Sequence, residues 1–179
     1  MARRILFIQG AGKGAHDDWD ARLVASLSAE LDTPVRYPRM PDEAEPRFVA
    51  WRAALIGEMA VLADGDLLIG HSVGGTMLLH VLAEMDPGFR PGALVLLAPP
   101  FVGEGGWESE DVPARTHFPL PAGMPALLFH GTADETVPPS HAALHAAAIP
   151  QLDVHLLQGR DHQLGNDLRD VAAAIRELH

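Results

Sequence analysis

The chain has no cysteine, one lysine, one tyrosine and no long hydrophobic run. Without cysteine it can form no disulfide, no thiolate nucleophile and no zinc–thiolate site. All of its apolar runs are shorter than the roughly 20 residues that a membrane-spanning helix needs. We therefore expect a cytoplasmic protein that has no membrane as a partner.

Basic residues are also scarce. Thirteen lysine and arginine residues stand against 24 acidic residues, and the formal net charge is −11. The arginines are scattered along the chain and form no cluster. Because nucleic acids and acidic membrane surfaces are bound by basic patches, the sequence predicts neither as a partner.

Hydrophobic residues, by contrast, make up 47% of the 179 residues, enough for one domain with a substantial core. The apolar stretch near the N-terminus covers only Ile5 to Ile8 and stops at Gln9-Gly10. We interpret it as a first strand and not as a signal peptide. We find no internal repeat and no linker, and expect a single domain over residues 1–179.

Apolar runs alternate with helical patterns from end to end. Runs such as Leu94–Leu97 show no alternation of polar and apolar residues, as expected for strands buried on both faces of a parallel sheet. This pattern predicts an α/β fold of about six mainly parallel strands flanked by helices. The expected strands are Arg4–Gln9, Pro34–Tyr37, Asp66–Ile69, Ala93–Ala98, Ala126–His130 and Asp153–Leu157.

Five helices are expected from apolar residues at helical spacing. The helix after Ser72 is apolar almost all round, which predicts a central position. Three others are expected at about residues 51–62, 139–150 and 168–178. The first helix is defined by an apolar stripe of Trp19, Leu23, Leu27 and Leu31.

One segment departs from this alternation. Residues 99–125 are rich in proline and glycine and interleave acidic residues with Phe101, Trp107 and Phe118. Such a long irregular connection is usually functional, and this one leaves the carboxyl end of a strand, where open α/β sheets bind ligands. We interpret it as a substrate-side loop. The alternative is a solvated loop with its aromatic residues packed underneath.

The most informative motif is Gly70-His71-Ser72-Val73-Gly74. It joins a buried apolar run to an apolar helical pattern, which is the strand–turn–helix context of a nucleophilic serine. The turn is so tight that Gly70 and Gly74 must be small, and it exposes the serine Oγ above the sheet. The alternative is a structural turn serine. His71 is expected to point away from Oγ, as a structural or pocket-lining residue.

A serine hydroxyl needs a base, and the base needs an orienting acid. Asp134 and His162 each follow an expected strand, so both leave the same edge of the sheet as Ser72. We therefore expect a catalytic triad of these three residues. The alternatives are that Asp134 caps a helix, that Glu135 is the acid, and that His162 is a surface histidine.

Together these motifs resemble those of the α/β-hydrolase superfamily. The pentapeptide resembles its nucleophile elbow, residues 130–138 its acid loop, and residues 159–162 its histidine loop, in which Asp161 replaces the usual small residue. The resemblance covers nearly the whole chain, although two N-terminal strands of the family and a cap domain have no counterpart. The chain is thus similar to the small, capless bacterial serine hydrolases and esterases, which implies a single-domain α/β-hydrolase fold.

The resemblance also implies an oxyanion hole made of backbone N–H groups. Val73 is one expected donor. The other belongs to the loop after the first strand, where Gln9-Gly10-Ala11-Gly12 stands in place of the family's His-Gly-x-Gly, so Ala11 is the second expected donor. Candidates for lining the substrate pocket are His16, Met40, Phe101 and Trp107.

Two other patterns favour different chemistry, and each is incomplete. His141 and His145 have a spacing that can bind zinc, but no third ligand is evident. Residues 10–15 fit a dinucleotide fingerprint, but Asp17-Asp18 would repel a pyrophosphate there. NADP binding, with Arg39 at a 2′-phosphate, is the alternative. We expect no metal and no cofactor.

The sequence thus predicts a serine hydrolase that cleaves the ester or thioester of a small molecule through an acyl-enzyme. The alternative is a non-catalytic hydrolase-like protein that binds a small ligand or a protein partner. Residues 99–125 would then form a docking surface. The sequence specifies neither the substrate nor the oligomeric state.

Overall fold

Six parallel strands form one sheet in the computed structural model, which describes residues 3–178. Their order across the sheet is β2-β1-β3-β4-β5-β6. The prediction of an α/β fold with about six mainly parallel strands is therefore confirmed. The strands are β1 (Ile5–Ile8), β2 (Val35–Arg36), β3 (Leu67–His71), β4 (Ala93–Leu97), β5 (Ala126–Gly131) and β6 (Leu152–Leu157).

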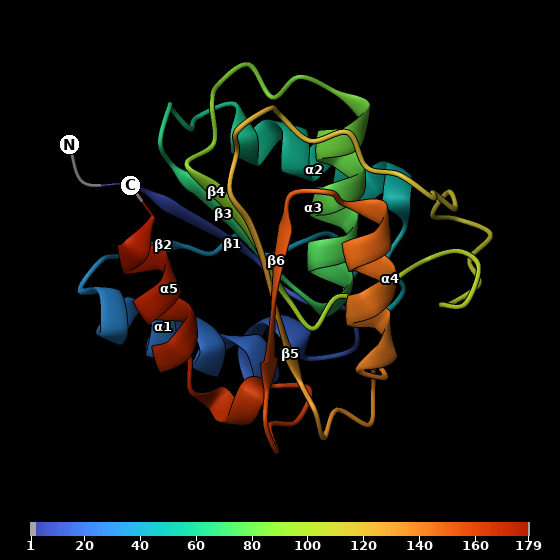
Figure 1. Cartoon of the computed structure of the whole chain (residues 1–179). Helices are drawn as coiled ribbons and strands as arrows, with labels where there is room; N and C mark the ends of the chain where they lie inside the picture. The colour runs from blue at the N-terminus through green and yellow to red at the C-terminus, as the bar shows by residue number, and fades with distance from the viewer. Residues whose placement is uncertain (1–2, 179) are drawn as a thin grey trace.

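Helices cover both faces of this sheet (Figure 1). One face packs against α1 (Ala21–Leu31) and α5 (Arg169–Glu177). The other face packs against α2 (Phe48–Met59), α3 (Ser72–Glu84) and α4 (Ser140–Ala148). None of the helices within residues 3–178 has the length and apolar character needed to cross a bilayer.

Two hydrophobic layers hold the sheet between the helices. Successive residues of a strand point to opposite faces, so Leu6 belongs to the layer under α3, whereas Phe7 belongs to the layer under α1. Leu78 and Leu79 of α3 are fully buried, which confirms the central position predicted for this helix. Burial of each such leucine contributes about 2 kcal/mol to stability, so α3 is firmly fixed to the sheet.

The first helix begins later than the sequence predicts. Ala15–Asp20 form a π-helical turn, and α1 begins only at Ala21. The hydrogen bonds of a π turn span five residues instead of four, so the turn is wider than an α-helical turn and shifts the register of the apolar stripe. Trp19, which we expected to be buried together with Leu23, is therefore 56% exposed, whereas Asp20 points into the interior.

The segment between β4 and β5 is irregular, as expected. Its regular structure is limited to an isolated bridge between Val102 and Trp107 among residues 98–125. Phe101 and Phe118 are buried in the layer under α3 and α4, while Trp107 remains 38% exposed. The segment thus combines both interpretations, because most of its aromatic residues pack underneath but one stays accessible. Its role as a substrate-side loop stays a prediction.

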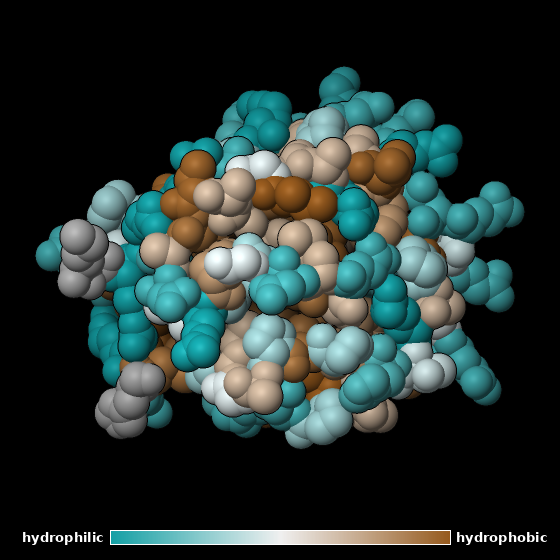
Figure 2. All heavy atoms as spheres, turned by 90° about the horizontal axis from the view of Figure 1, so that it is seen from above, coloured by the Kyte–Doolittle hydropathy of each residue, from teal (hydrophilic) through white to brown (hydrophobic). Residues whose placement is uncertain are grey.

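The amino ends of the strands form the face that Figure 2 shows from above. The segments of residues 85–92 and 119–125 meet on this side of the molecule (Figure 1). Hydrophobic residues gather between charged ones here, and Met85, Phe89 and Leu120 line a shallow hollow of about 500 Å³. This face lies opposite the carboxyl ends of the strands, where the predicted site residues are found.

Two histidines in the layer under α3 are buried and neutral. His80 packs edge-on against Phe48 and Phe118, and neither of its ring nitrogens has a hydrogen-bond partner within residues 3–178. Burial lowers the pKa of His80 to about 4 and the pKa of His145 to about 3. The unfolded chain takes up these protons near pH 6.5, so the free energy of unfolding should fall as the pH drops from 6.5 towards 4.

We expect His80→Leu to reduce this pH dependence. Between pH 7.5 and pH 5 the wild type should lose about 2 kcal/mol more of its free energy of unfolding than the variant does, because leucine takes up no proton. Urea denaturation at the two pH values measures both losses. His117→Asn, at an exposed position, is the control and should behave as the wild type. An equal loss in His80→Leu and the wild type would contradict the prediction.

Candidate active site

Ser72 is the first residue of α3 and directly follows β3. Its φ angle is 50°, in the left-handed region that non-glycine residues rarely adopt, so the backbone is strained here. The flanking glycines permit this turn. A Cβ atom on Gly70 would lie 2.5 Å from the Cα of Gly75, and one on Gly74 would overlap the carbonyl oxygen of Gln9. The small residues predicted at positions 70 and 74 are thus required by direct contact with α3 and β1.

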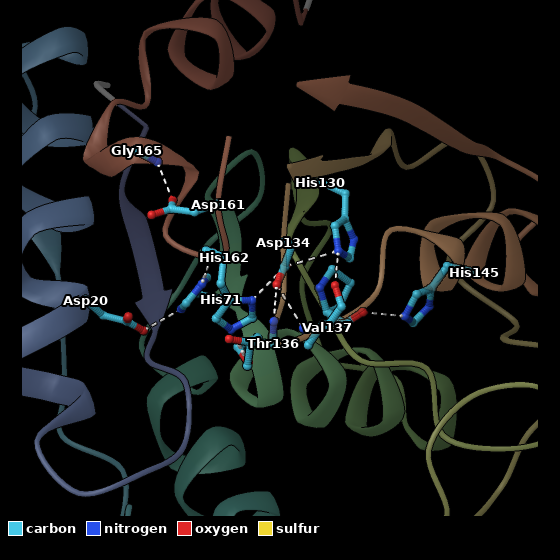
Figure 3. Close-up of polar contacts among 12 residues, drawn as sticks. Asp20, His71, His130, Asp134, Thr136, Val137, His145, Asp161, His162 and Gly165 are labelled. Atoms are coloured by element: carbon cyan, nitrogen blue, oxygen red, sulfur yellow. Dashed lines mark hydrogen bonds and ion pairs between the residues drawn. The ribbon is translucent and has the colours of Figure 1, made fainter. Parts of the chain in front are cut away.

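The structure brings together the three residues of the predicted triad. Nε2 of His162 lies 3.0 Å from Oγ of Ser72. Nδ1 of His162 lies 2.8 Å from Oδ2 of Asp134 (Figure 3). Asp134 follows β5 and His162 follows β6, so parallel strands deliver all three side chains to one edge of the sheet. The imidazole can therefore accept the Ser72 proton at Nε2 while it donates its Nδ1–H to the carboxylate.

Asp134 is fixed in place by further contacts. Its Oδ1 accepts the N–H groups of Thr136 and Val137, each at 2.8 Å, and its Oδ2 also lies 3.2 Å from Nε2 of His130. Burial alone would raise the pKa of Asp134, but hydrogen bonds from His130, His162 and Val137 outweigh it and hold this pKa well below its usual range. Asp134 is therefore a buried carboxylate that caps a turn with one oxygen and faces His162 with the other.

Glu135 and Asp161, two further acidic residues near His162, are placed differently. Glu135 is exposed on the rim of the cavity described below. Asp161 accepts the N–H of Gly165 at 2.8 Å, so its carboxylate stabilises the turn that carries His162 (Figure 3). A Cβ atom on Gly131 would lie 2.6 Å from the carbonyl oxygen of Asp161, so the acid and histidine loops pass in close contact.

The two expected oxyanion donors, the backbone N–H groups of Val73 and Ala11, lie beside Ser72. Val73 lies in the first turn of α3, where N–H groups have no acceptor within the helix. Within residues 3–178, no acceptor is found for the N–H of Ala11. Both residues line the cavity next to Ser72, and Gly10 approaches closely enough that its Cβ would lie 3.2 Å from the Cβ of Ser72.

The loop that carries Ala11 is held by Glu43, a residue that sequence analysis did not single out. The Glu43 carboxylate accepts the N–H groups of Gly14 at 3.0 Å and His16 at 2.9 Å, and its backbone carbonyl accepts the N–H of Gly12 at 2.6 Å. The side chain of Gln9 donates to the same carboxylate. Three N–H groups of the kind that a pyrophosphate would need are thus already hydrogen-bonded. Gln9 has a structural role in place of the family's histidine.

A cavity of about 800 Å³ opens above Ser72 and His162. Of the four predicted pocket residues, only Trp107 is among its lining residues. His16 stacks on the ring of Tyr37 at a centroid distance of 4.1 Å, which turns it away from the cavity. Met40 and Phe101 are buried in the hydrophobic layer under α3 and also lie outside the cavity lining. Trp19, which the π turn exposes, lines the cavity instead.

His141 and His145 have structural partners. Nδ1 of His141 accepts the N–H of Phe101 at 2.8 Å, and Nε2 of His145 lies 3.3 Å from the carbonyl oxygen of Pro99. Both rings therefore anchor the start of the segment of residues 99–125 to α4. The described part of the chain contains no group of three or more histidine, aspartate or glutamate side chains placed to hold a metal ion.

A parallel sheet with a strained serine turn after β3, and an acid and a histidine after β5 and β6, defines an α/β hydrolase. The chain belongs to the serine hydrolase family, whose sequence model matches residues 5–164. A search of curated proteins finds no match to this chain.

Solved structures show the same fold. Mouse alpha/beta hydrolase domain-containing protein 10 is 21% identical, with 99% of this chain and 90% of that one covered and a TM-score of 0.72. The ydeN gene product of B. subtilis is 18% identical, with 99% and 98% covered and a TM-score of 0.68. The esterase domain of a Rhodothermus marinus protein is 23% identical, with 98% and 83% covered and a TM-score of 0.62. These similarities establish the α/β-hydrolase fold and no particular substrate.

Proposed function

We propose that this serine hydrolase cleaves the carboxylic ester or thioester of a small molecule through an acyl-enzyme. The observation that carries the proposal is the continuous series of contacts from Ser72 through His162 to Asp134, with distances of 3.0 and 2.8 Å. These contacts lie at the base of an open cavity of about 800 Å³, beside two backbone N–H groups that are free to bind a developing negative charge.

In the proposed reaction, Oγ of Ser72 attacks the substrate carbonyl carbon while Nε2 of His162 takes the hydroxyl proton. The ionised Asp134 holds the imidazole with its Nδ1–H towards the carboxylate and stabilises the imidazolium that forms. The N–H groups of Ala11 and Val73 stabilise the oxyanion. The protonated His162 then gives its proton to the leaving alcohol or thiol. Water attacks the acyl-enzyme with His162 again as base, which releases the acid and regenerates Ser72.

The position of the Trp107 side chain supports a proposal for where the acyl group of the substrate binds. Trp107 and Val73 line both the main cavity and an adjoining hollow of about 180 Å³. The hollow is mainly apolar, with Met77, Val102 and Val112 among its lining residues. We propose that a short acyl chain enters this hollow while the alcohol or thiol part occupies the larger, open cavity.

We expect Trp107→Ala to shift the preference towards longer acyl chains. Removing the indole joins the hollow to the main cavity, so the ratio of kcat/KM for p-nitrophenyl octanoate to that for the acetate should rise about 10-fold. Trp19→Ala is the matched control, because Trp19 lines the main cavity but not the hollow. It should change kcat/KM for the two esters by similar factors. A ratio that is unchanged in Trp107→Ala would refute the assignment of the acyl chain to the hollow.

The proposed function is tested by labelling with a fluorophosphonate and measuring the mass of the intact protein. A single adduct on Ser72, together with turnover of p-nitrophenyl esters or acyl thioesters, is the expected result. The relative kcat/KM for matched oxygen and thiol esters would then distinguish an esterase from a thioesterase. A folded protein with neither adduct nor turnover would instead favour the non-catalytic binding protein.

A further inference from the structure

A second histidine–aspartate pair lies beside the proposed triad and has no part in the reaction described above. Nδ1 of His71 lies 2.9 Å from Oδ2 of Asp20, and Nε2 of His71 lies 3.0 Å from the backbone carbonyl oxygen of His162 (Figure 3). The side chains of His71 and Asp20 are only 2% and 1% exposed. The ring of His71 is 4.8 Å from that of His162, centroid to centroid.

The partners of His71 determine its protonation state. A carboxylate and a carbonyl oxygen only accept hydrogen bonds, so each ring nitrogen of His71 must carry a hydrogen, and the ring is an imidazolium. Burial alone would lower the pKa of His71, but the charge and hydrogen bond of Asp20 and the carbonyl of His162 raise it above its ordinary value. Among the charged groups near His71, Asp134 favours the cation as well.

Asp20 is correspondingly held as a carboxylate. Burial alone would raise the pKa of Asp20, but the positive charge and hydrogen bond of His71 and the N–H of Gly10 lower it. The N–H of Gly10 donates to the same Oδ2 atom at 2.6 Å. The two side chains thus form a buried ion pair whose charges cancel.

This ion pair contacts the backbone next to, or belonging to, three groups of the proposed reaction: the oxyanion donor, the nucleophile and the base. Gly10 directly precedes Ala11, the proposed oxyanion donor, and His71 directly precedes Ser72, the proposed nucleophile. The carbonyl that His71 binds belongs to His162, the proposed base. The loops after β1, β3 and β6 therefore share a single anchoring point, in addition to their separate contacts.

We infer that the Asp20–His71 ion pair is a positioning device, which sets the distances among the oxyanion donor, the nucleophile and the base. This inference rests on the proposed function. His71 and Asp20 both border the cavity, but the two ring nitrogens of His71 bind Asp20 and the carbonyl of His162 and not the Ser72 hydroxyl. The pair therefore acts through the backbone of its neighbours. Catalysis is sensitive to such placement, since a displacement of about 1 Å at a reacting group can cost about 100-fold in rate.

The kinetic test compares two variants in which a buried carboxylate becomes an amide. Asp20→Asn keeps the size of the side chain but removes the charge that holds the His71 imidazolium. Asp66→Asn is the matched control. Asp66 is a buried carboxylate that accepts the N–H groups of Arg4 and Ala63, at the amino end of β3 and away from the cavity.

We expect Asp20→Asn to lower kcat about 10- to 100-fold with little change in KM, and to slow fluorophosphonate labelling by a similar factor. Asp66→Asn should keep the wild-type kcat even where it lowers the melting temperature. If the ion pair only stabilises the fold, both variants will lose stability while both keep the wild-type kcat, and the inference is overturned.

A measurement on the wild type keeps the inference testable if Asp20→Asn fails to fold. In protein with ¹⁵N-labelled histidine at pH 7.5, we expect one buried ring with hydrogens on both nitrogens, and this signal should persist in His162→Gln. The absence of any doubly protonated ring overturns the inference. If the wild type reacts with the fluorophosphonate and hydrolyses the esters, a retained kcat in Asp20→Asn rejects the positioning role alone. If the wild type does not react with the fluorophosphonate at all, the proposed function is rejected and, with it, the positioning role.

Discussion

Ser72→Ala should lower kcat for p-nitrophenyl esters by about 10⁴-fold or more without unfolding the protein. The substitution removes only Oγ, which the proposed reaction uses as its nucleophile, and leaves the Cβ and the backbone of the turn in place. The residual rate should come from the oxyanion donors and the cavity. Steady-state kinetics measure the loss, and an unchanged melting temperature shows that the fold is intact.

Ser140→Ala provides a matched control for this result. Ser140 is also the first residue of a helix, α4, but it is exposed and lies outside the cavity. Its substitution should leave kcat within about twofold of the wild type, as surface substitutions away from a site usually do. If pure Ser72→Ala protein retained its esterase activity, Ser72 would not be the nucleophile.

Asp134→Asn should reduce kcat by about 10³- to 10⁴-fold with little change in KM. An amide can donate to Nδ1 of His162 and so favours the tautomer whose Nε2 carries a hydrogen, which cannot accept the Ser72 proton.

The wild-type carboxylate of Asp134 should also stabilise the fold. Because the folded-state pKa of Asp134 is lowered from an ordinary value of 3.8, this contribution is complete at neutral pH and is lost as the pH falls below about 4.

Glu135→Gln separates the two candidate acids. Glu135 is exposed and adjacent to Asp134 in the sequence, so its substitution applies the same chemical change one residue away. We expect kcat to stay within about twofold of the wild type, since an amide at this position would change only the rim of the cavity. The opposite outcome, a large loss in Glu135→Gln and a small one in Asp134→Asn, would assign the acid to Glu135.

The fold and the meeting of Ser72, Asp134 and His162 could be predicted because their signals are local. Runs such as Leu94–Leu97 are apolar at every position, which few structures other than a doubly covered parallel strand accommodate. Ser72 directly follows β3, whereas Asp134 and His162 follow β5 and β6 after short loops. Parallel strands end at a common edge. The positions of these residues along the chain therefore determine their proximity in space.

Asp20 and Glu43 could not be predicted in the same way. Each lies in an acidic stretch whose other members, such as Asp18 and Asp42, are exposed, and nothing local separates the residue with structural partners from its neighbours. Their placement depends on distant partners, since Asp20 meets His71 across 51 positions of sequence. The π turn that orients Asp20 has no clear local signal either, and it is the reason that Trp19 lies on the surface.

Three of the four predicted pocket residues lie outside the cavity lining for a related reason. His16, Met40 and Phe101 lie just beyond strand ends, which placed their backbones near the cavity but left the directions of their side chains open. Tyr37 offers His16 a stacking partner, and the hydrophobic layer under α3 takes Met40 and Phe101. Only Trp107 kept an exposed position beside Ser72.

The strand order also determines when the site can form during folding. The contact between Ser72 and His162 spans 90 positions of sequence, and β6, which precedes His162, pairs only with β5 at one edge of the sheet. Such distant contacts cost chain entropy before they give stability, so they tend to form late. The turn at Ser72 needs only β1, β3 and α3 to form, whereas His162, the proposed base, takes its place only when β6 pairs with β5. The recovery of ester hydrolysis during refolding would therefore report the docking of this last strand and not the earlier collapse of the core.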